Sequence, residues 1–207
     1  FTNVEFVIEN GTLTIEKRNV TLTSKGDSKV YDGTPLTNDK VEVTGDGFVK
    51  GEGATYNVTG TITNVGSTDN TFTYKLKDGT KAGNYKITPA YGTLIVTANN
   101  QQVIVKITGH SGTEKYDGTE KNVSDYDVSI TKGSTYTAND FTFSGTAEAK
   151  GTDAGTYNMG LRADMFANAN SNFTDVTFEV TDGTLTIEKR NVTLTSKGAE
   201  KVYDGTA

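Results

Sequence analysis

The tetrad Tyr-Asp-Gly-Thr is the residue combination in this chain that comes nearest to a binding site. It occurs three times, at Tyr31-Asp32-Gly33-Thr34, Tyr116-Asp117-Gly118-Thr119 and Tyr203-Asp204-Gly205-Thr206. An aromatic ring beside a carboxylate can stack on a sugar. Asp-Gly between two extended segments is also a tight-turn signal, because glycine adopts positive φ without strain. We interpret the tetrads as structural turns and keep ligand binding as the alternative.

A second recurring motif places a tyrosine at the start of an expected strand. Its two copies are Ala82-Gly83-Asn84-Tyr85 and Ala154-Gly155-Thr156-Tyr157. A small residue, a glycine, a polar residue and then tyrosine are typical of a tyrosine corner, in which the phenol bonds back to the backbone and fixes a connection between sheets. The sequence therefore predicts architectural roles for Tyr85 and Tyr157.

The sequence contains no pattern typical of catalysis. His110 is the only histidine and lies in a Gly-His-Ser-Gly turn, and the chain has no cysteine. A multi-histidine metal site, a thiolate nucleophile and a cysteine zinc site are therefore excluded within one chain, and no nucleophile motif accompanies the imidazole. No nucleotide-binding fingerprint is present. We predict that the chain is not an enzyme and holds no cofactor.

Calcium binding and an isopeptide cross-link are two further kinds of chemistry that these residue types allow. The loops 67–70 and 170–172 are rich in Asp, Asn and Ser, which could supply oxygen ligands to calcium, but they lack the spacing of known calcium loops. We therefore predict no metal site. A Lys-Asn isopeptide cross-link needs a lysine that points into an apolar core. Lys75, Lys86 and Lys106 alternate out of phase with their apolar neighbours, which disfavours such a bond.

Strands are expected almost everywhere to position these motifs. Val4, Phe6 and Ile8 alternate with polar residues before Asn10-Gly11, and the alternation then resumes, which predicts a β-hairpin over residues 4–17. The apolar residues change from odd to even positions at residues 17–19. A strand with a two-residue period makes that change only at a bulge or where the chain passes to another sheet. We interpret this point as a domain junction.

A longer excursion in the second half of the chain is the segment that most favours a helix. Residues 161–167 combine helix-forming residues with apolar positions at Leu161, Met165 and Phe166. We expect one or two helical turns there, with these three side chains packed inward.

The chain is internally repetitive. The sixteen residues GTLTIEKRNVTLTSKG at 11–26 recur unchanged at 183–198, an offset of 172 residues, and residues 1–35 match residues 173–207 at 26 of 35 positions. We predict four parts: a C-terminal hairpin of a preceding repeat (1–17), a first repeat (18–98), a second repeat (99–189) and the start of a further repeat (190–207). The expected fold is all-β, with tandem immunoglobulin-like β-sandwich domains, and a β-grasp-like domain is the alternative for the second repeat.

Composition limits the kinds of partner. The formal net charge is −6, and no apolar run approaches the roughly 18 residues that span a bilayer. Nucleic acids and anionic membranes favour basic patches, so we expect neither a nucleic-acid partner nor membrane insertion of this fragment. A long extracellular protein without disulfides fits a Gram-positive surface.

Several strings resemble the YDG and MBG repeats of large bacterial surface proteins. They include VTLTSKGDSKVYDGTPLTNDKVEVTGDGF and GEGATYNVTGTITNVGSTDNTFTYKLKDGTKAGNYKIT for the YDG type, and EKYDGTEKNV, GTDAGTYNMGLRADMF and NFTDVTFEVTDGTLTI for the MBG type. The resemblance covers nearly the whole chain and includes the alternation of the two types. It implies a secreted, cell-wall-attached adhesin, in which such repeats form a stalk, and it supplies no catalytic residues.

These observations lead to an expected function. The repeats would be structural spacers that contact neighbouring repeats of the same chain and project a binding region from a bacterial cell surface. The alternative is that the repeats themselves bind a host glycan or protein. Solvent exposure separates the two, because a binding role gains if Tyr31 and Tyr116 line grooves with Asp32 and Asp117 and weakens if the rings are buried.

Overall fold

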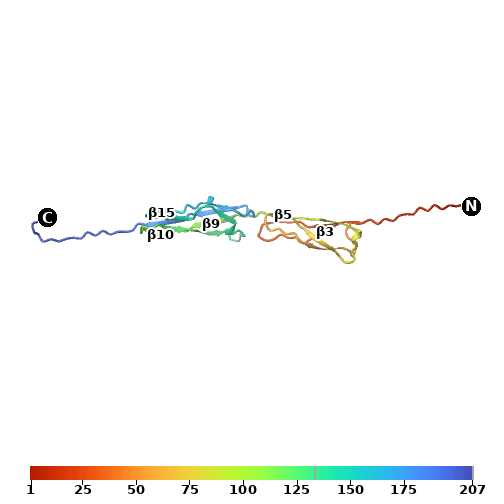
Figure 1. Ribbon diagram of the computed structural model, residues 1–207, viewed down its shortest axis with the longest axis horizontal. Coiled ribbons are helices and arrows are strands. Elements are labelled where there is room, and N and C mark those ends of the chain that lie inside the picture. The colour runs from red at the N-terminus through yellow and green to blue at the C-terminus, as the bar shows by residue number, and fades with distance from the viewer. Residues whose placement is uncertain (133, 207) are drawn as a thin grey trace. The chain divides into compact units, whose positions relative to one another are not determined.

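The protein is all-β. The computed structural model describes residues 1–132 and 134–206, and Figure 1 shows their course. The chain divides into two compact units, one formed by residues 1–100 with 171–174 and the other by residues 101–170 with 175–207. Within the described residues, helical structure is confined to three 3-10 turns: η1 (Ala82–Asn84), η2 (Ala138–Asp140) and η3 (Ala163–Met165). None of these could cross a membrane.

The first unit is built on two broken strands that run parallel to each other. Its strands are β1 (Arg18–Ser24), β2 (Asp27–Val30), β3 (Val41–Gly45), β4 (Ala54–Val58), β5 (Gly66–Asp69), β6 (Phe72–Leu76), β7 (Tyr85–Ala90) and β8 (Thr93–Thr97). β1 pairs with β7 and β2 with β8, both in parallel, while β3 flanks β1 and β5 flanks β8 in antiparallel register. β4 and β6 form a separate antiparallel pair.

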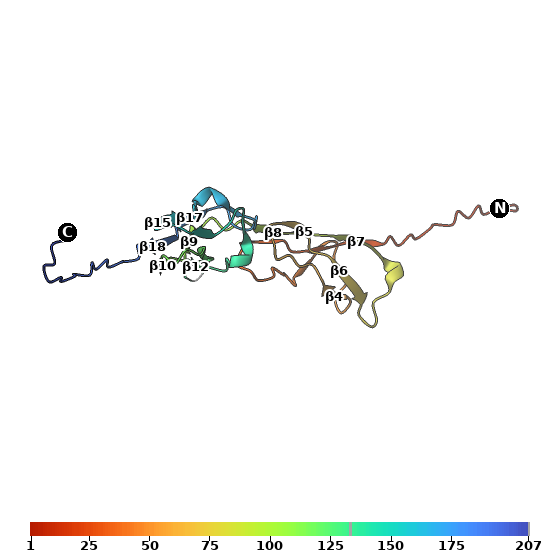
Figure 2. The same cartoon turned by 60° about the vertical axis from the view of Figure 1, so that its left-hand side comes forward.

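The second unit repeats this topology. Its strands are β9 (Val103–Gly109), β10 (Gly112–Lys115), β11 (Lys121–Ser124), β12 (Tyr126–Ile130), β13 (Phe141–Phe143), β14 (Glu148–Gly151), β15 (Gly155–Asn158), β16 (Phe166–Asn168), β17 (Val176–Thr181) and β18 (Thr184–Glu188). β9 and β10 pair in parallel with β17 and β18, β12 flanks β9 and β15 flanks β18. Figure 2 shows β9, β17 and β18 within this unit.

The two units therefore correspond element by element. β1, β2, β3, β5, β7 and β8 of the first unit match β9, β10, β12, β15, β17 and β18 of the second. The β4–β6 pair corresponds to β13–β16, and an isolated bridge between Leu36 and Ile62 takes the place of the β11–β14 pair. Two repeats of divergent sequence thus share one chain path.

A two-residue period builds the cores. Val20 and Leu22 in β1 and Leu94 and Val96 in β8 are buried while their neighbours face outward, as the pleat of a strand requires. The same alternation buries Val103, Val105 and Ile107 in β9 and Leu185 and Ile187 in β18. In the second unit, Phe166 also packs among the rings of Tyr126, Phe141, Phe143 and Phe178. The predicted all-β, sandwich-type fold is confirmed.

The breaks in the long strands depend on glycine. A Cβ added at Gly92, between β7 and β8, would lie 2.3 Å from the Gly26 nitrogen and 2.4 Å from the Ser24 oxygen. At Gly183, between β17 and β18, it would lie 2.3 Å from the His110 oxygen. Backbone crosses backbone so closely at both corners that no side chain fits there.

The structure does not form the hairpin predicted over residues 4–17, and the assignment of residues 1–17 to a preceding repeat stays a prediction. Residues 1–17 form no strand, and their apolar side chains are exposed. Where the same sequence pattern does form strands, at β17 and β18, the two strands enter different sheets. The Asp182 carboxylate accepts hydrogen bonds from the nitrogens of Gly160 (3.0 Å) and Leu161 (2.9 Å), which anchors this corner to a remote loop instead of a tight hairpin turn.

The segment 161–167 is less helical than predicted. Only η3 is helical, and β16 follows it at once. Leu161 and Phe166 are buried and Met165 is half-buried, so these side chains do pack inward. Tyr157 lies in β15, which corresponds to β5, so Tyr157 is not the counterpart of Tyr85 in β7. With β15 aligned to β5, the segment from β15 to β17 is nearly as long as the segment from β5 to β7.

Candidate functional site

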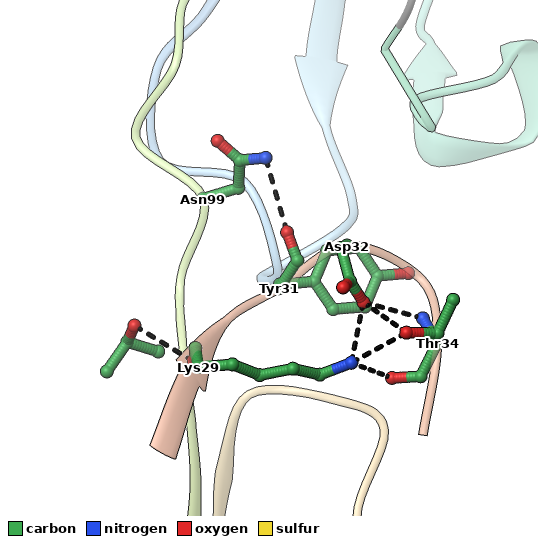
Figure 3. A network of polar contacts seen from close by, with 6 residues as sticks. Lys29, Tyr31, Asp32, Thr34 and Asn99 are labelled. Carbon is green, nitrogen blue, oxygen red and sulfur yellow. Dashed lines mark hydrogen bonds and ion pairs between the residues drawn. The ribbon is translucent and has the colours of Figure 1, made fainter. Parts of the chain in front are cut away.

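The first tetrad folds into a self-contained polar turn, shown in Figure 3. The Lys29 ammonium donates to Asp32 Oδ1 (2.7 Å) and to the backbone oxygen (2.5 Å) and hydroxyl (2.7 Å) of Thr34. Asp32 Oδ1 also accepts from the nitrogen (2.9 Å) and hydroxyl (2.7 Å) of Thr34. Gly33 has a φ of 81°, which a glycine adopts at no cost. The carboxylate is therefore occupied by its own turn.

The second tetrad makes the same turn, but its lysine follows the aspartate in the sequence instead of preceding it. Asp117 Oδ1 accepts from the nitrogen (2.9 Å) and hydroxyl (2.7 Å) of Thr119, while Lys121 Nζ lies 2.7 Å from Asp117 Oδ2. Glu114 occupies the strand position that Lys29 has in the first unit. The cation has changed place in sequence, but the aspartate keeps a lysine partner.

The third tetrad shows that the turn is encoded locally. Residues 190–206 form no strand, yet Asp204 Oδ1 accepts from the nitrogen (3.0 Å) and hydroxyl (2.8 Å) of Thr206, and Lys201 Nζ lies 2.8 Å from it. Gly205 again has a φ of 81°. Aspartate and threonine side chains that bond their neighbouring backbone stabilise such turns without tertiary support.

These contacts lower the pKa of each aspartate. The bonds from Lys29 and Thr34 hold the pKa of Asp32 well below its usual range, and those from Lys121 and Thr119 do the same for the pKa of Asp117. The stabilisation is therefore present above the unfolded-state pKa of about 3.9 and is lost as the pH falls through it towards the folded-state pKa.

Replacing both carboxylates should reduce the acid sensitivity of the protein. We expect Asp32→Asn with Asp117→Asn to lower the thermal unfolding midpoint slightly at pH 7 and to reduce its fall between pH 5 and pH 2. Asp204→Asn is the matched control, because its tetrad lies outside the strands, and it should leave both quantities unchanged. Thermal unfolding followed by circular dichroism measures them. An unaltered acid response in the double variant would contradict the role given to these turns.

The tetrad tyrosines differ in exposure. Tyr31 is half-buried, packs against the cluster of Leu36, Leu94 and Val96, and meets Phe173 edge-on with ring centroids 5.4 Å apart. Tyr116 is 38% exposed and lines a pocket of about 440 Å³ together with Asp153, Ala154, Lys189, Arg190 and Val192. Asp117 is not among the residues that line this pocket beside Tyr116.

The two other tyrosines make different contacts. The Tyr157 hydroxyl donates to the Asp153 oxygen, four residues upstream (3.0 Å), which is the local bond of a tyrosine corner. The Tyr85 hydroxyl donates to the Glu52 carboxylate and accepts from the Val49 nitrogen (3.2 Å), so it fixes a distant loop. The hydrogen bond to Glu52 raises the pKa of Tyr85, with burial contributing in the same direction. Both phenols act within the fold.

The remaining candidates form no reactive group. His110 is partly exposed, with Nδ1 3.1 Å from the Ser124 oxygen and Nε2 3.4 Å from Asp127 Oδ1. Lys75, Lys86 and Lys106 are exposed, which does not support a buried cross-link. Among the described residues, no three His, Cys, Asp or Glu side chains gather as metal ligands.

Sequence reasoning did not single out Tyr136, whose phenol is buried. It is 3% exposed, and its hydroxyl lies 2.9 Å from the Asp140 oxygen and 3.0 Å from Asn168 Oδ1. Burial, with a smaller contribution from the Asp140 charge, raises the pKa of Tyr136 to about 12. The adjacent Thr137-Ala-Asn-Asp140 forms a capping box, a sequence signal that could have located this turn.

Comparison with known families bears on the second unit. Residues 103–189 match the family model described as MBG domain. The second unit contains an MBG-type repeat. The matched range of this MBG-type repeat begins at the first residue of β9 and ends one residue after β18, so it covers the whole set of paired strands. No curated protein and no solved structure matched the chain. The assignment of residues 18–98 to the YDG type stays a prediction.

Proposed function

We propose that the chain is a set of non-catalytic spacer repeats from the stalk of a bacterial, cell-wall-attached surface adhesin, and that the repeats project a binding region away from the cell. The observation that carries this proposal is the combination of a 172-residue sequence period with one chain path shared by two diverged units. Repetition of a self-contained β domain increases length by copy number without requiring a new fold.

The tetrad geometry supports a structural role for the most suggestive motif. Asp32 and Asp117 are hydrogen-bonded within their own turns and paired with Lys29 and Lys121. A ligand that used these carboxylates would have to displace the lysines and the threonine donors. The sequence composition, which lacks cysteine, is compatible with an extracellular Gram-positive location.

The alternative is that the repeats themselves bind a host glycan or glycoprotein. It draws on one observation, the exposed Tyr116 ring in its open pocket. Aromatic rings in exposed concave surfaces are common binding features. Asp117 does not line this pocket, so the arrangement that would have strengthened the binding hypothesis is not found here, and we keep the spacer function as the better-supported proposal.

Small-angle scattering tests the spacer function. The chain is compared with a version in which the 172-residue period is repeated once, and the variable is the increase in maximum dimension. A spacer predicts that the added period lengthens the particle by as much as the first one contributes. Growth as about the square root of repeat number would indicate flexible connections and contradict the proposal. Glycan arrays would then test the alternative.

A further inference from the structure

We propose that the surface around Tyr116 is a docking site for a first-type unit that follows Lys189, that is, a second copy of residues 18–98. The proposal rests on the proposed function only in assuming that repeats follow one another. The Tyr116 surface is defined by Tyr116, Asp153, Ala154 and Lys189, which line the 440 Å³ pocket together with Arg190 and Val192 from the start of the following repeat. The docked copy would contact the Tyr116 surface with the end opposite the one that carries its own Tyr31.

Two pockets in the structure share one sequence segment. The second pocket, of about 220 Å³, belongs to the first unit and is lined by residues 15–18 together with Val49, Glu52, Gly83, Asn84 and Tyr85. Residues 15–18, Ile-Glu-Lys-Arg, recur unchanged at 187–190, and Lys189 and Arg190 line the Tyr116 pocket. When a first-type unit follows Lys189, the walls of both pockets must meet at Lys189 and Arg190, the two residues of the repeated segment that line both.

The first unit supplies a precedent for what fills such a surface. Tyr31 is the counterpart of Tyr116: its nitrogen donates to the Thr97 oxygen at the end of β8 (2.8 Å), as the Tyr116 nitrogen donates to the Glu188 oxygen at the end of β18 (2.9 Å). Around Tyr31, the first unit includes the segment 171–174, whose Phe173 ring packs edge-on against it.

The other residues that contact the segment 171–174 also have counterparts beside Tyr116. The Val65 nitrogen donates to Asn172 Oδ1 (2.8 Å), and Asn172 Nδ2 lies 3.2 Å from Asn64 Oδ1. Residues 64–65 precede β5 as Asp153 and Ala154 precede β15, so the corresponding walls line the Tyr116 pocket.

The precedent also identifies the docking segment. Residues 171–174 lie just before β17, whose counterpart in the first unit is β7. The segment before β7 contains Gly83 and Asn84, which line the second pocket. Val49 at the same end is 48% exposed, so an apolar side chain is available to cover the Tyr116 ring.

Charged groups complement this arrangement. The Arg18 guanidinium donates to the Gly47 oxygen (3.0 Å) and to the Asp46 oxygen. These two bonds hold the loop after β3 against the start of β1. Arg190 is the same residue of the shared segment, so it can make the same bonds to a following unit. Lys189 would then face Glu52, just as its copy Lys17 lines the second pocket with Glu52.

The test compares the 207-residue chain with an extended chain, residues 1–189 followed by a second copy of residues 18–98. Amide hydrogen exchange, resolved by peptide, reports on the second unit in each chain. Docking predicts that Tyr116→Ala lowers protection at residues 112–118 and 153–158 by about tenfold in the extended chain and by less than about threefold in the 207-residue chain. Equal effects in the two chains would overturn the proposal.

A second variant keeps the test independent of any folding defect caused by Tyr116→Ala. Val49→Ser in the second copy should reproduce the loss of protection around Tyr116, and combining it with Tyr116→Ala should add little further loss. Val49→Ser in the first copy is the matched control and should leave that region unchanged. Protection of Tyr116 by added oligosaccharide in the 207-residue chain, without protection by the extension, would make the pocket a ligand site and would also overturn docking. The scattering experiment tests the spacer function independently of this docking, because an extended array needs no contact at Tyr116.

Discussion

Replacing Leu22 by alanine is expected to destabilise the first unit by about 2 to 5 kcal/mol, while Leu194→Ala should change its stability by less than about 0.5 kcal/mol. The two leucines occupy the same position in the repeated sequence NVTLTSKG. Leu22 is 0% exposed in β1, and Leu194 is 91% exposed in a segment that forms no strand. The pair therefore holds local sequence constant and varies only burial.

The physical reason is the loss of packing around Leu22. It belongs to the cluster of Val20, Phe72 and Tyr85, and truncation removes buried methyl groups and leaves a cavity that close-packed neighbours fill only in part. Denaturant unfolding followed by hydrogen exchange in β1 and β7 measures the loss. A Leu22→Ala chain as stable as the parent would contradict the assignment of β1 to this core.

Replacing Gly183 by alanine is expected to cost about 3 kcal/mol or more in the second unit. A Cβ there would lie 2.3 Å from the His110 oxygen and 2.9 Å from the Gly109 carbon, both of them backbone atoms. Backbone cannot rotate away as a side chain can, so the corner between β17 and β18 would have to move away from the corner between β9 and β10. The paired strands on either side would lose register.

Gly11→Ala is the matched control for Gly183→Ala. Gly11 begins the same sixteen-residue string, but no atom lies within 4 Å of its added Cβ, and the substitution should be nearly neutral. Unfolding of both variants can be followed by circular dichroism in denaturant. If Gly183→Ala were as stable as Gly11→Ala, the close approach of the two corners would not exist in solution.

Strand positions were predictable from sequence because the signal is local. The alternation of Val20 with Leu22, and of Val103 with Val105 and Ile107, needs only a buried face and a two-residue period. The turns at the tetrads were predictable for the same reason, since Asp32 and Thr34 bond each other within three residues. Both features are independent of which strand lies alongside.

Strand partners were not predictable in the same way. Asn10-Gly11 and Asp182-Gly183 carry a hairpin signal, but the Asp182 carboxylate binds two nitrogens more than twenty residues upstream and Gly183 packs against another corner. These long-range contacts replace the hairpin by a parallel pairing of first and last strands. The similar motifs ending in Tyr85 and Tyr157 were also misleading, because they lie on strands that do not correspond.

The Tyr116 surface could not have been found from the sequence alone. Its residues come from β10, from the loop before β15 and from the end of β18, which the fold brings to one place. Only the strand correspondence identifies Asp153 and Ala154 as counterparts of residues 64–65. Only the repeat period shows that Lys189 and Arg190 of the Tyr116 pocket are copies of Lys17 and Arg18 in the second pocket.

We propose that residues 190–206, which form no strand here, become the first strands of a further first-type unit when the rest of that unit follows them, within an array of alternating units. The most direct test of this central claim is the unfolding free energy lost on Leu194→Ala in the extended chain, in which this leucine is followed by the rest of a first-type repeat. The account predicts that the loss rises from near zero in the 207-residue chain to the value found for Leu22→Ala, about 2 to 5 kcal/mol. A loss that stays near zero in the extended chain, with Leu22→Ala still costly, would contradict the alternating array.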